Sequence, residues 1–357
     1  MKLDMLRPLY EREGPYASAY LNTDRAMEQG GDQVELRWKA LSEQLADTDK
    51  ATLAVLEKLF TDVNAAAPGR AAFAAGGEIL YTEALAEPPR RATARWSPLP
   101  HVMPLLAQRG ENVPHVRVII DHLGADVVTV GPGAPRRTSV QVQDWPHQKT
   151  SQGGWSQRHY ENNVEETWAR NARAVAEAVD EEVRRVGAEL VVVAGDPQSR
   201  PLLVDKLGKE ASDRLVVVDH GSRATGSDPF PFNQDVEAAI DSWLDRRRKE
   251  LLERYEEGSA KELAACGLSD VACALREGRV DTVLMVDRPD SDALMWVGPE
   301  GGQLAVEREE MQEWGVAEPV QDRADAALAR AIAATDAELW FVPELDVPGE
   351  IAAVFRF

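Results

Sequence analysis

The sequence predicts an α/β protein of three domains, and three observations support this. Short β-branched strands alternate with segments of helical periodicity along the chain. Breaks rich in Pro and Gly interrupt the alternation near residues 97–112 and at residues 258–259. The length of 357 residues suits two or three domains of about 100–150 residues each. We therefore expect domains over residues 1–112, 113–257 and 258–357.

In the first domain, residues 16–22 alternate as a strand. Two helices are expected over residues 32–45 and 48–64, and the second has apolar residues at helical spacing. Residues 71–75, 78–83 and 93–96 are typical of short strands, with Gly76 and Gly77 as a turn between the first two. The pattern indicates a small α/β domain.

In the middle domain, residues 116–120 and 126–130 predict a hairpin, and residues 139–143 predict a third strand. A long helix is expected over 157–186, with an apolar stripe that includes Trp168, Val175 and Val183. Strands over 190–194 and 215–218, and helices over 201–207 and 233–257, complete the pattern. It predicts a mixed sheet flanked by helices.

The last domain is predicted to be a small α/β sandwich. Helices are expected over 261–277, broken at Gly267, and over 324–335, with strands over 282–286, 293–296, 339–341 and 352–357. Residues 258–357 contain 8 Lys and Arg against 20 Asp and Glu, which is −12 of the net charge of −21. Because this surface repels phosphate, we expect it to face protein rather than RNA.

The composition is that of a soluble globular protein, with 44% hydrophobic and 28% charged residues. No apolar run approaches the roughly 18 residues of a membrane span, and the N-terminus lacks the order of a signal peptide. We therefore expect a cytoplasmic protein without a membrane partner. Cys266 and Cys273 fit neither a disulfide framework nor a metal knuckle, so buried thiols are expected.

A polar loop over residues 144–156 precedes the longest predicted helix and carries Gly153 and Gly154, whose backbone has little steric restriction. Residues 135–160 have a net charge of +3 within the acidic chain. We name this candidate RNA-binding segment the glycine loop, and it predicts a probe for nucleic acid. Its residues are His147, Lys149, Gln152, Gly153, Gly154, Trp155, Ser156, Arg158 and His159.

Further cations are candidate rRNA contacts. They are Arg136, Arg137, Arg246, Arg247, Arg248 and Lys249. The last four cover a full helical turn, which is more often a solvated face.

A metal nuclease is an alternative, because Asp121 and His122 follow a strand and further acids are available at Asp196, Asp205 and Asp219. Such chemistry requires several carboxylates that converge on metal ions. The acids are more typical of turns at strand ends, and the six His show no ligand spacing. We expect no metal and no cofactor.

Residues 117–203 resemble the middle domain of the archaeal and eukaryotic class-one release factors and their relative Pelota. The hairpin, the Gly153–Gly154 pair, the helix behind it and the strand ending in Ala194 and Gly195 follow that family's order. By secondary structure the outer thirds resemble its N-terminal domain and its small C-terminal domain of ribosomal-protein type. The whole chain resembles the bacterial branch, which includes the ribosome hibernation factor Balon.

The resemblance implies a factor that occupies the ribosomal A site. The glycine loop would then face the peptidyl-transferase centre, with rRNA and tRNA nearby. The first third would face the decoding region, and the last third a translational GTPase or the stalk base. DNA is not an expected partner.

The sequence departs from the family at the critical position. Release factors carry Gly-Gly-Gln, whereas Trp155 follows Gly154 here, and stop-codon-reading motifs are not found in the first third. Gln157 keeps a Gly-x-x-Gln spacing that resembles the eukaryotic quality-control branch, which cleaves peptidyl-tRNA. Gln157 is therefore the candidate catalytic residue, or simply an exposed residue behind an N-cap at Ser156.

Trp155 is expected either to stack on a base or to lie in the protein core. The literal Gly301–Gly302–Gln303 lies in the acidic third and is expected to be a hairpin turn. We favour occupation of the A site without hydrolysis, meaning hibernation or protection of idle ribosomes, so enzymatic activity stays an open question. Peptidyl-tRNA cleavage during ribosome rescue is the alternative, and an interaction protein that does not need the ribosome is a third.

Overall fold

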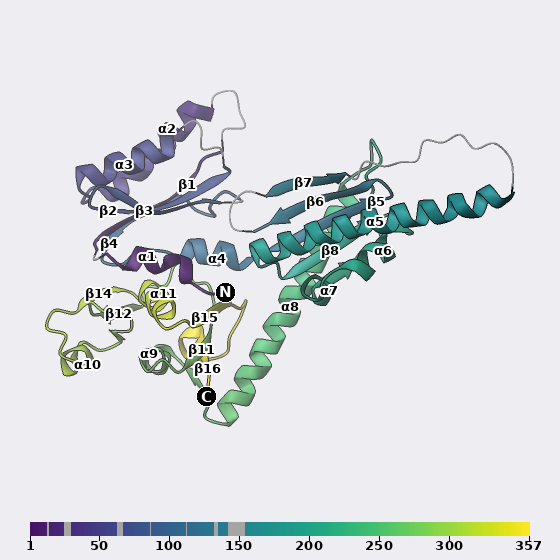
Figure 1. Ribbon diagram of the computed structural model, residues 1–357. Helices are drawn as coiled ribbons and strands as arrows, with labels where there is room; N and C mark the ends of the chain where they lie inside the picture. Colours follow the sequence, from purple (N-terminus) through teal and green to yellow (C-terminus); the bar gives the residue numbers. More distant parts are fainter. Residues whose placement is uncertain are drawn as a thin grey trace. The chain divides into compact units, whose positions relative to one another are not determined.

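The computed structural model describes the backbone of residues 1–12, 14–24, 30–62, 67–85, 87–111, 113–131, 135–141 and 154–357 (Figure 1). For residues 30–32, 111 and 154–165 the description stops at the backbone. The chain forms two compact units, one of residues 1–111 with 248–357 and one of residues 112–247. The first and last thirds thus share a unit, and the three-domain division stays a prediction.

The first half of the larger unit contains an antiparallel sheet in the order β3-β2-β1-β4. Its helices α2 and α3 bring Trp38, Leu56 and Phe60 onto the face of the sheet that includes Leu21. Asp49 caps α3 because its side chain accepts a hydrogen bond from the amide of Thr52 at 2.9 Å. The elements are α1 (Arg7–Tyr10), β1 (Tyr16–Asn22), α2 (Gly30–Ser42), α3 (Lys50–Thr61), β2 (Gly69–Ala75), β3 (Glu78–Leu85), β4 (Thr93–Ser97) and α4 (Met103–Glu111).

The second half of this unit contains a four-stranded sheet, β10-β16-β11-β15, and a three-stranded sheet, β13-β12-β14. Every residue of α11 from Ala326 to Ala333 is buried. The elements are β10 (Ala264–Cys266), α9 (Leu268–Arg276), β11 (Val280–Met285), β12 (Leu294–Val297), β13 (Leu304–Ala305), α10 (Arg308–Glu313), β14 (Val320–Arg323), α11 (Ala324–Ala334), β15 (Glu338–Phe341) and β16 (Ile351–Phe355).

Three predictions for the last third can be compared with this structure. Gly301–Gly302–Gln303 forms the turn of the β12–β13 hairpin, as predicted, and the carbonyl of Gln303 accepts from the amide of Gly298 at 3.0 Å. The predicted helix over 261–266 is wrong, because residues 264–266 pair with β16 instead. The prediction of buried thiols is also wrong, since Cys266 and Cys273 are only half-buried.

A buried carboxylate joins the two halves of this unit. Asp322 is 3% exposed and accepts from the amide of Leu99 at 2.8 Å and from Arg95 Nη2 at 3.0 Å. One hydrophobic core also contains residues from both halves, such as Phe73 and Leu339. The sequence separation of these partners explains why spacing alone does not reveal the shared unit.

The smaller unit contains a five-stranded mixed sheet in the order β7-β6-β5-β8-β9, which confirms the predicted fold. Strands β5, β6 and β7 pair antiparallel, whereas β5, β8 and β9 pair parallel. The elements are β5 (His115–Asp121), β6 (Gly124–Val130), β7 (Arg136–Gln141), α5 (Gly154–Val186), β8 (Leu190–Gly195), α6 (Ser199–Lys206), α7 (Lys209–Asp213), β9 (Leu215–Val217) and α8 (Phe230–Ala260).

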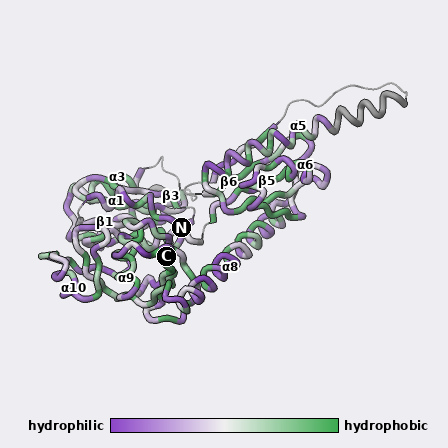
Figure 2. The backbone as a smooth tube through the Cα atoms, turned by 60° about the horizontal axis from the view of Figure 1, so that its bottom comes forward, coloured by the Kyte–Doolittle hydropathy of each residue, from purple (hydrophilic) through white to green (hydrophobic). Residues whose placement is uncertain are grey.

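Helices cover both faces of this sheet (Figure 1). On one face, Val175, Val179 and Val183 of α5 pack with strand residues such as Val118, which confirms the packed part of the predicted stripe. On the other face, Phe232 of α8 packs with residues of β8. Figure 2 shows hydrophilic and hydrophobic colours alternating along α8, as expected of a helix with one buried side.

Some element limits differ from the predictions. Helix α5 begins at Gly154 rather than at Gln157, so Ser156 lies inside its first turn and is not the N-cap. Residues 258–259, predicted to mark a boundary, lie within α8. Strand β9 is half-buried rather than buried, because it forms the edge of the sheet. Within the described ranges, no helix is both long and apolar enough to cross a membrane.

Candidate functional site

The glycine loop is only partly described. His147, Lys149, Gln152 and Gly153 lie outside the described residues, as do the side chains of Trp155, Ser156, Gln157, Arg158 and His159. The backbone of α5 begins at Gly154, so Gly154 and Gln157 lie in the first turn of one helix. Of the predicted site residues, those from Gly154 to His159 therefore lie at the start of α5, and the roles of all of them stay predictions.

The loop leaves the sheet where the parallel strands end. Gln141, the last residue of β7, pairs with Gly124, the first residue of β6, which itself pairs with Asp121 at the end of β5. We call the edge at which β5, β7, β8 and β9 end the carboxyl edge. A side chain at Gly124 is excluded, because a Cβ atom there would lie 1.9 Å from the carbonyl oxygen of Val140.

Helix α5 meets this edge well after its own start. Asn171 is 5% exposed and donates from Nδ2 to the carbonyl oxygen of His122 at 2.8 Å. Residues 154–167 precede this contact and correspond to about 20 Å of helix at about 1.5 Å per residue. In Figure 1, α5 extends past the ends of the strands. The start of α5 is therefore carried away from the sheet.

A cluster around His122 fixes α5 at this edge. The His122 ring stacks on Trp168 with centroids 4.0 Å apart and planes at 14°. Its Nδ1 lies 3.0 Å from Ser199 Oγ, and its Nε2 lies 3.6 Å from Asp196 Oδ2. We name His122, Trp168, Asn171, Asp196 and Ser199 the His122 junction. It joins the end of β5 to α5 and to the start of α6.

Asp196 organises the start of α6. Its Oδ2 accepts from the amides of Gln198 at 2.9 Å and Ser199 at 2.8 Å, and from Ser199 Oγ at 3.0 Å. Burial alone would raise the pKa of Asp196, but these hydrogen bonds and nearby His122 lower it below its usual value. Asp196 is therefore held as a carboxylate.

The junction contains serine, histidine and aspartate but lacks the arrangement of a nucleophilic triad. In a triad the histidine accepts the serine proton, and the acid orients the histidine. Here Ser199 is 3% exposed and its hydroxyl donates to Asp196. A buried hydroxyl bound to a carboxylate is neither accessible nor activated. We conclude that the junction positions α5.

The acids considered for metal chemistry are engaged elsewhere. Arg223 Nη1 lies 2.6 Å from Asp121 Oδ1, and Arg200 Nη1 lies 3.4 Å from Asp219 Oδ1. Asp205 Oδ2 lies 2.8 Å from Lys206 Nζ. Across the described residues, no group of three or more His, Cys, Asp or Glu side chains is arranged to hold a metal ion.

The candidate rRNA contacts are not equally available. Arg136 Nη1 lies 3.1 Å from Glu182 Oε1, and Glu182 is 8% exposed, so the charge of Arg136 is already paired. Arg137 is exposed on β7. On α8, Arg246 and Lys249 are exposed, whereas Arg247 and Arg248 are half-buried. As rRNA contacts all six stay predictions.

The comparisons with known proteins show that the smaller unit is similar to a family of release factors. Residues 114–261 match the model of the bacterial archaeo-eukaryotic release factor family 2. This match bears out the predicted resemblance to the bacterial branch of the release factor and Pelota group. The match includes the glycine loop, all of α5 and the His122 junction.

Relatives over the whole chain are more distant. An uncharacterized protein of Mycobacterium tuberculosis, Rv2629 in strain H37Rv and MT2704 in strain CDC 1551 / Oshkosh, is 29% identical over 95% of this chain and 92% of its own length. Ribosome-bound archaeal Pelota, in a model with ABCE1, is similar at 16% identity and a TM-score of 0.41, covering 100% of this chain and 95% of that chain. The archaeal termination factor aRF1 shows 15% identity and a TM-score of 0.26, covering 99% and 96%.

Proposed function

We propose that this protein is a ribosome-binding translation factor that occupies the A site and directs its glycine loop at the peptidyl-transferase centre. The observation that carries the proposal is the family match over residues 114–261. The matched segment contains residues 135–160, whose net charge of +3 contrasts with the acidic chain. Cations close to phosphates supply affinity that depends on salt.

The arrangement of the smaller unit supports this role. Gln141 and Gly154, the described residues on either side of residues 142–153, belong to regular elements, a strand that ends at the carboxyl edge and the start of α5. The first part of α5 adds about 20 Å of reach, and the His122 junction holds the helix at its base. A loop on such a support enters a narrow RNA cavity without the body of the protein.

The absence of the family's glutamine favours occupation over hydrolysis. Trp155 replaces the residue whose backbone would help position water in a release factor. An aromatic ring in that place supplies stacking on a base rather than a hydrolytic function. We therefore propose hibernation or protection of idle ribosomes, and the resemblance to Balon stays a prediction.

Peptidyl-tRNA cleavage during ribosome rescue is a second candidate, and one observation favours it. Because α5 begins at Gly154, the Gly-x-x-Gln spacing places Gln157 one helical turn beyond the glycine pair. The backbone N–H groups of a helix's first turn have no partner inside the helix. Gln157 and these groups would orient a nucleophile or a phosphate.

The acidic last third is proposed to contact protein, with a translational GTPase as the expected partner. Its charge of −12 disfavours contact with RNA phosphates. A GTPase that binds there would escort the factor to the ribosome. Pull-down of purified GTPases with residues 1–357, at low and at moderate salt, tests this contact.

Ribosome binding is tested by co-sedimentation with 70S particles over a range of salt concentrations. We expect binding to weaken as salt rises. Trp155→Ala should weaken it by about 1–3 kcal/mol if the ring stacks on a base. Phe230→Ala is the matched control, because Phe230 is an aromatic residue of the same unit that is 61% exposed and lies outside the loop. If the wild type binds at no salt concentration, the third alternative is favoured, an interaction protein that does not need the ribosome.

Hydrolysis is tested with ribosomes that carry labelled peptidyl-tRNA. If the protein only occupies the A site, it releases no label and protects the ester from puromycin. Release that stops in Gln157→Ala but continues in Gln303→Ala would contradict hibernation and support rescue. Gln303 is a suitable control because it follows a glycine pair in a hairpin turn of the other unit.

A further inference from the structure

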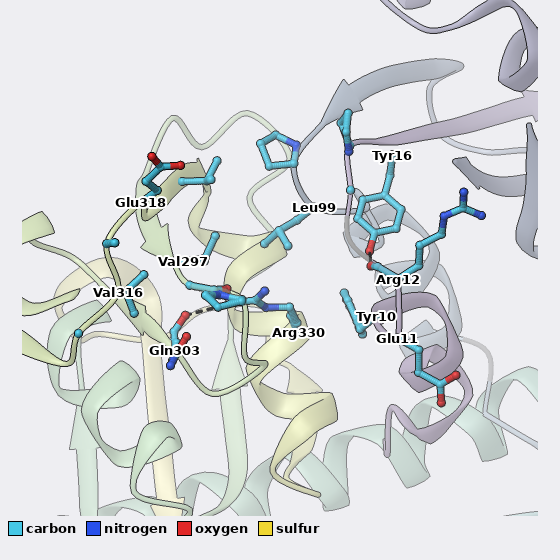
Figure 3. Close-up of a pocket in the computed structure, with 18 residues that line it drawn as sticks. Tyr10, Glu11, Arg12, Tyr16, Leu99, Val297, Gln303, Val316, Glu318 and Arg330 are labelled. Carbon is cyan, nitrogen blue, oxygen red and sulfur yellow. Dashed lines mark hydrogen bonds between the residues drawn. The ribbon is translucent and has the colours of Figure 1, made fainter. Parts of the chain in front are cut away.

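A cavity of about 850 Å³ lies within the larger unit, between the segment from α1 to β1 and the β12–β13 hairpin with α11 (Figure 3). Its volume is in the range of small-molecule sites, roughly 300–1,000 Å³. Most of its wall is apolar or aromatic. The residues that matter here are Leu99, Val297, Val316, Tyr10 and Tyr16.

Arg330 supplies a positive charge to this apolar cavity. It is 8% exposed, and its Nη2 donates to the carbonyl oxygens of Gly298 at 2.9 Å, Glu300 at 3.1 Å and Gln303 at 3.2 Å. Its Nε has no hydrogen-bond partner. Within the described part of the chain, no carboxylate forms an ion pair with Arg330. Burial of a guanidinium without a counter-ion is unfavourable, so an anion would complete this site.

A second unused donor lines the same cavity. The hydroxyl of Tyr10 is buried and has no hydrogen-bond partner. Burial raises the pKa of Tyr10 above its usual value, although the charge of Arg330 opposes this in part, so the hydroxyl keeps its proton. In Figure 3, Arg330 reaches from α11 into the cavity, and Tyr10 and Tyr16 lie on the side opposite Gln303. Arg330 Nε and the Tyr10 hydroxyl are therefore two donors without a hydrogen-bond partner in residues that line one cavity.

The other charges around the cavity limit the kind of anion. Arg12 is paired with Glu78 at 3.0 Å. Glu11 and Glu318 are exposed, and Figure 3 shows both pointing away from Arg330. One unpaired cation with two acids nearby disfavours a phosphate or a polyanion, which carries at least one further negative charge. The single positive charge of Arg330 and the apolar wall of the cavity together fit a ligand that has one carboxylate and an apolar body.

We propose that this cavity binds a ligand with one carboxylate and an apolar body, held by Arg330 and Tyr10. A carboxylate has two oxygens, which suit one guanidinium and one phenol as donors. The ligand is a small apolar acid or the carboxyl end of an apolar peptide, since both present the same chemistry. The site lies outside residues 114–261 and does not depend on the proposed ribosomal role.

The proposal is tested by calorimetry and thermal denaturation of the full chain at pH 7. The probes are phenylacetate, 3-phenylpropionate and their primary amides. An apolar tripeptide with a free or an amidated C-terminus distinguishes the two sources. We expect the acids to bind and raise Tm, and the amides to bind at least about tenfold more weakly, since a hydrogen bond to a charged group is worth about 1.5–3 kcal/mol.

Three variants show whether the two donors hold the ligand. Arg330→Met should abolish the preference for acid over amide. Tyr10→Phe should weaken acid binding about three- to tenfold through the loss of one hydrogen bond, and it keeps the test valid if Arg330→Met does not fold. Tyr20→Phe is the control, because Tyr20 is a buried tyrosine of the same unit whose hydroxyl donates to the carbonyl of His101 at 2.7 Å, outside this cavity.

Five results would overturn the proposal. The first four are equal binding of acids and amides, no binding of any acid, unchanged acid binding by Tyr10→Phe, and tighter binding of inorganic phosphate than of the acids. Glu13 lies outside the described residues. Acid binding that appears only in Glu13→Gln would also overturn the proposal, because a carboxylate of the chain itself would then occupy the site.

Discussion

Substitution of His122 by Ala is expected to loosen the base of α5 while leaving the sheet intact. His122 is the shared partner of the junction, stacked on Trp168 and 3.0 Å from Ser199. Its removal deletes the ring contacts that link the end of β5 to α5 and to the start of α6, whereas the hydrogen bond from Asn171 to the backbone carbonyl of residue 122 remains. If the start of α5 carries the functional loop, ribosome binding should weaken as well.

The expected loss of stability is about 1–3 kcal/mol. The stacked rings contribute about 0.5–1.5 kcal/mol beyond burial. The hydrogen bond with Ser199 contributes about another 0.5–1.5 kcal/mol, because Ser199 is buried. The contact with Asp196 is counted as close to zero, since it is 3.6 Å long and both side chains are 28% exposed.

Urea unfolding and amide hydrogen exchange measured by mass spectrometry check this prediction. Exchange should accelerate in peptides of α5 and α6 and stay unchanged in the larger unit. His220→Ala is the control, because His220 also contacts a carboxylate, Asp235, at 2.9 Å but is 63% exposed. His220→Ala is expected to change the free energy of unfolding by less than about 0.5 kcal/mol. Equal changes in the exchange of α5 in His122→Ala and His220→Ala would show that the His122 ring does not hold α5 at the sheet.

Two further predictions concern single groups. Tyr20→Phe should destabilise the larger unit by about 1–2 kcal/mol, whereas Tyr10→Phe should be neutral or stabilising, because only Tyr20 has a hydrogen-bond partner to lose. Equal losses of unfolding free energy for the two variants in urea would contradict this prediction. The pKa of Asp196 is lower in the folded than in the unfolded state, so its contribution to stability is present above the unfolded value of about 4 and is lost as pH falls through the folded value. Asp196→Asn should therefore lower the free energy of unfolding at pH 7 and make this free energy fall less steeply as the pH is lowered. If it falls as steeply in the variant as in the wild type, the folded state does not lower the pKa of Asp196.

The sequence alone determined the mixed sheet of the smaller unit. The run Val191–Val193 and the stripe of α5 are local patterns, and each matches the period of the element it forms. The turn at Gly301–Gly302–Gln303 was predictable for the same reason. The glycine loop was found by its composition, but the start of α5 was missed, because a glycine pair is as typical of a loop as of a helix beginning.

Tertiary structure decided everything that depends on a distant partner. Residues 264–266 form a strand because β16 offers hydrogen bonds, which outweigh the local helical preference of alanine. His122 and Ser199 meet across 77 residues, and no spacing signals such a contact. Arg330 has no anionic partner in the described residues because the fold buries its helix, α11, in the core that the two halves of the larger unit share. A sequence shows which groups carry charge and hydrogen-bond donors, and only the folded chain shows which of them remain unpaired.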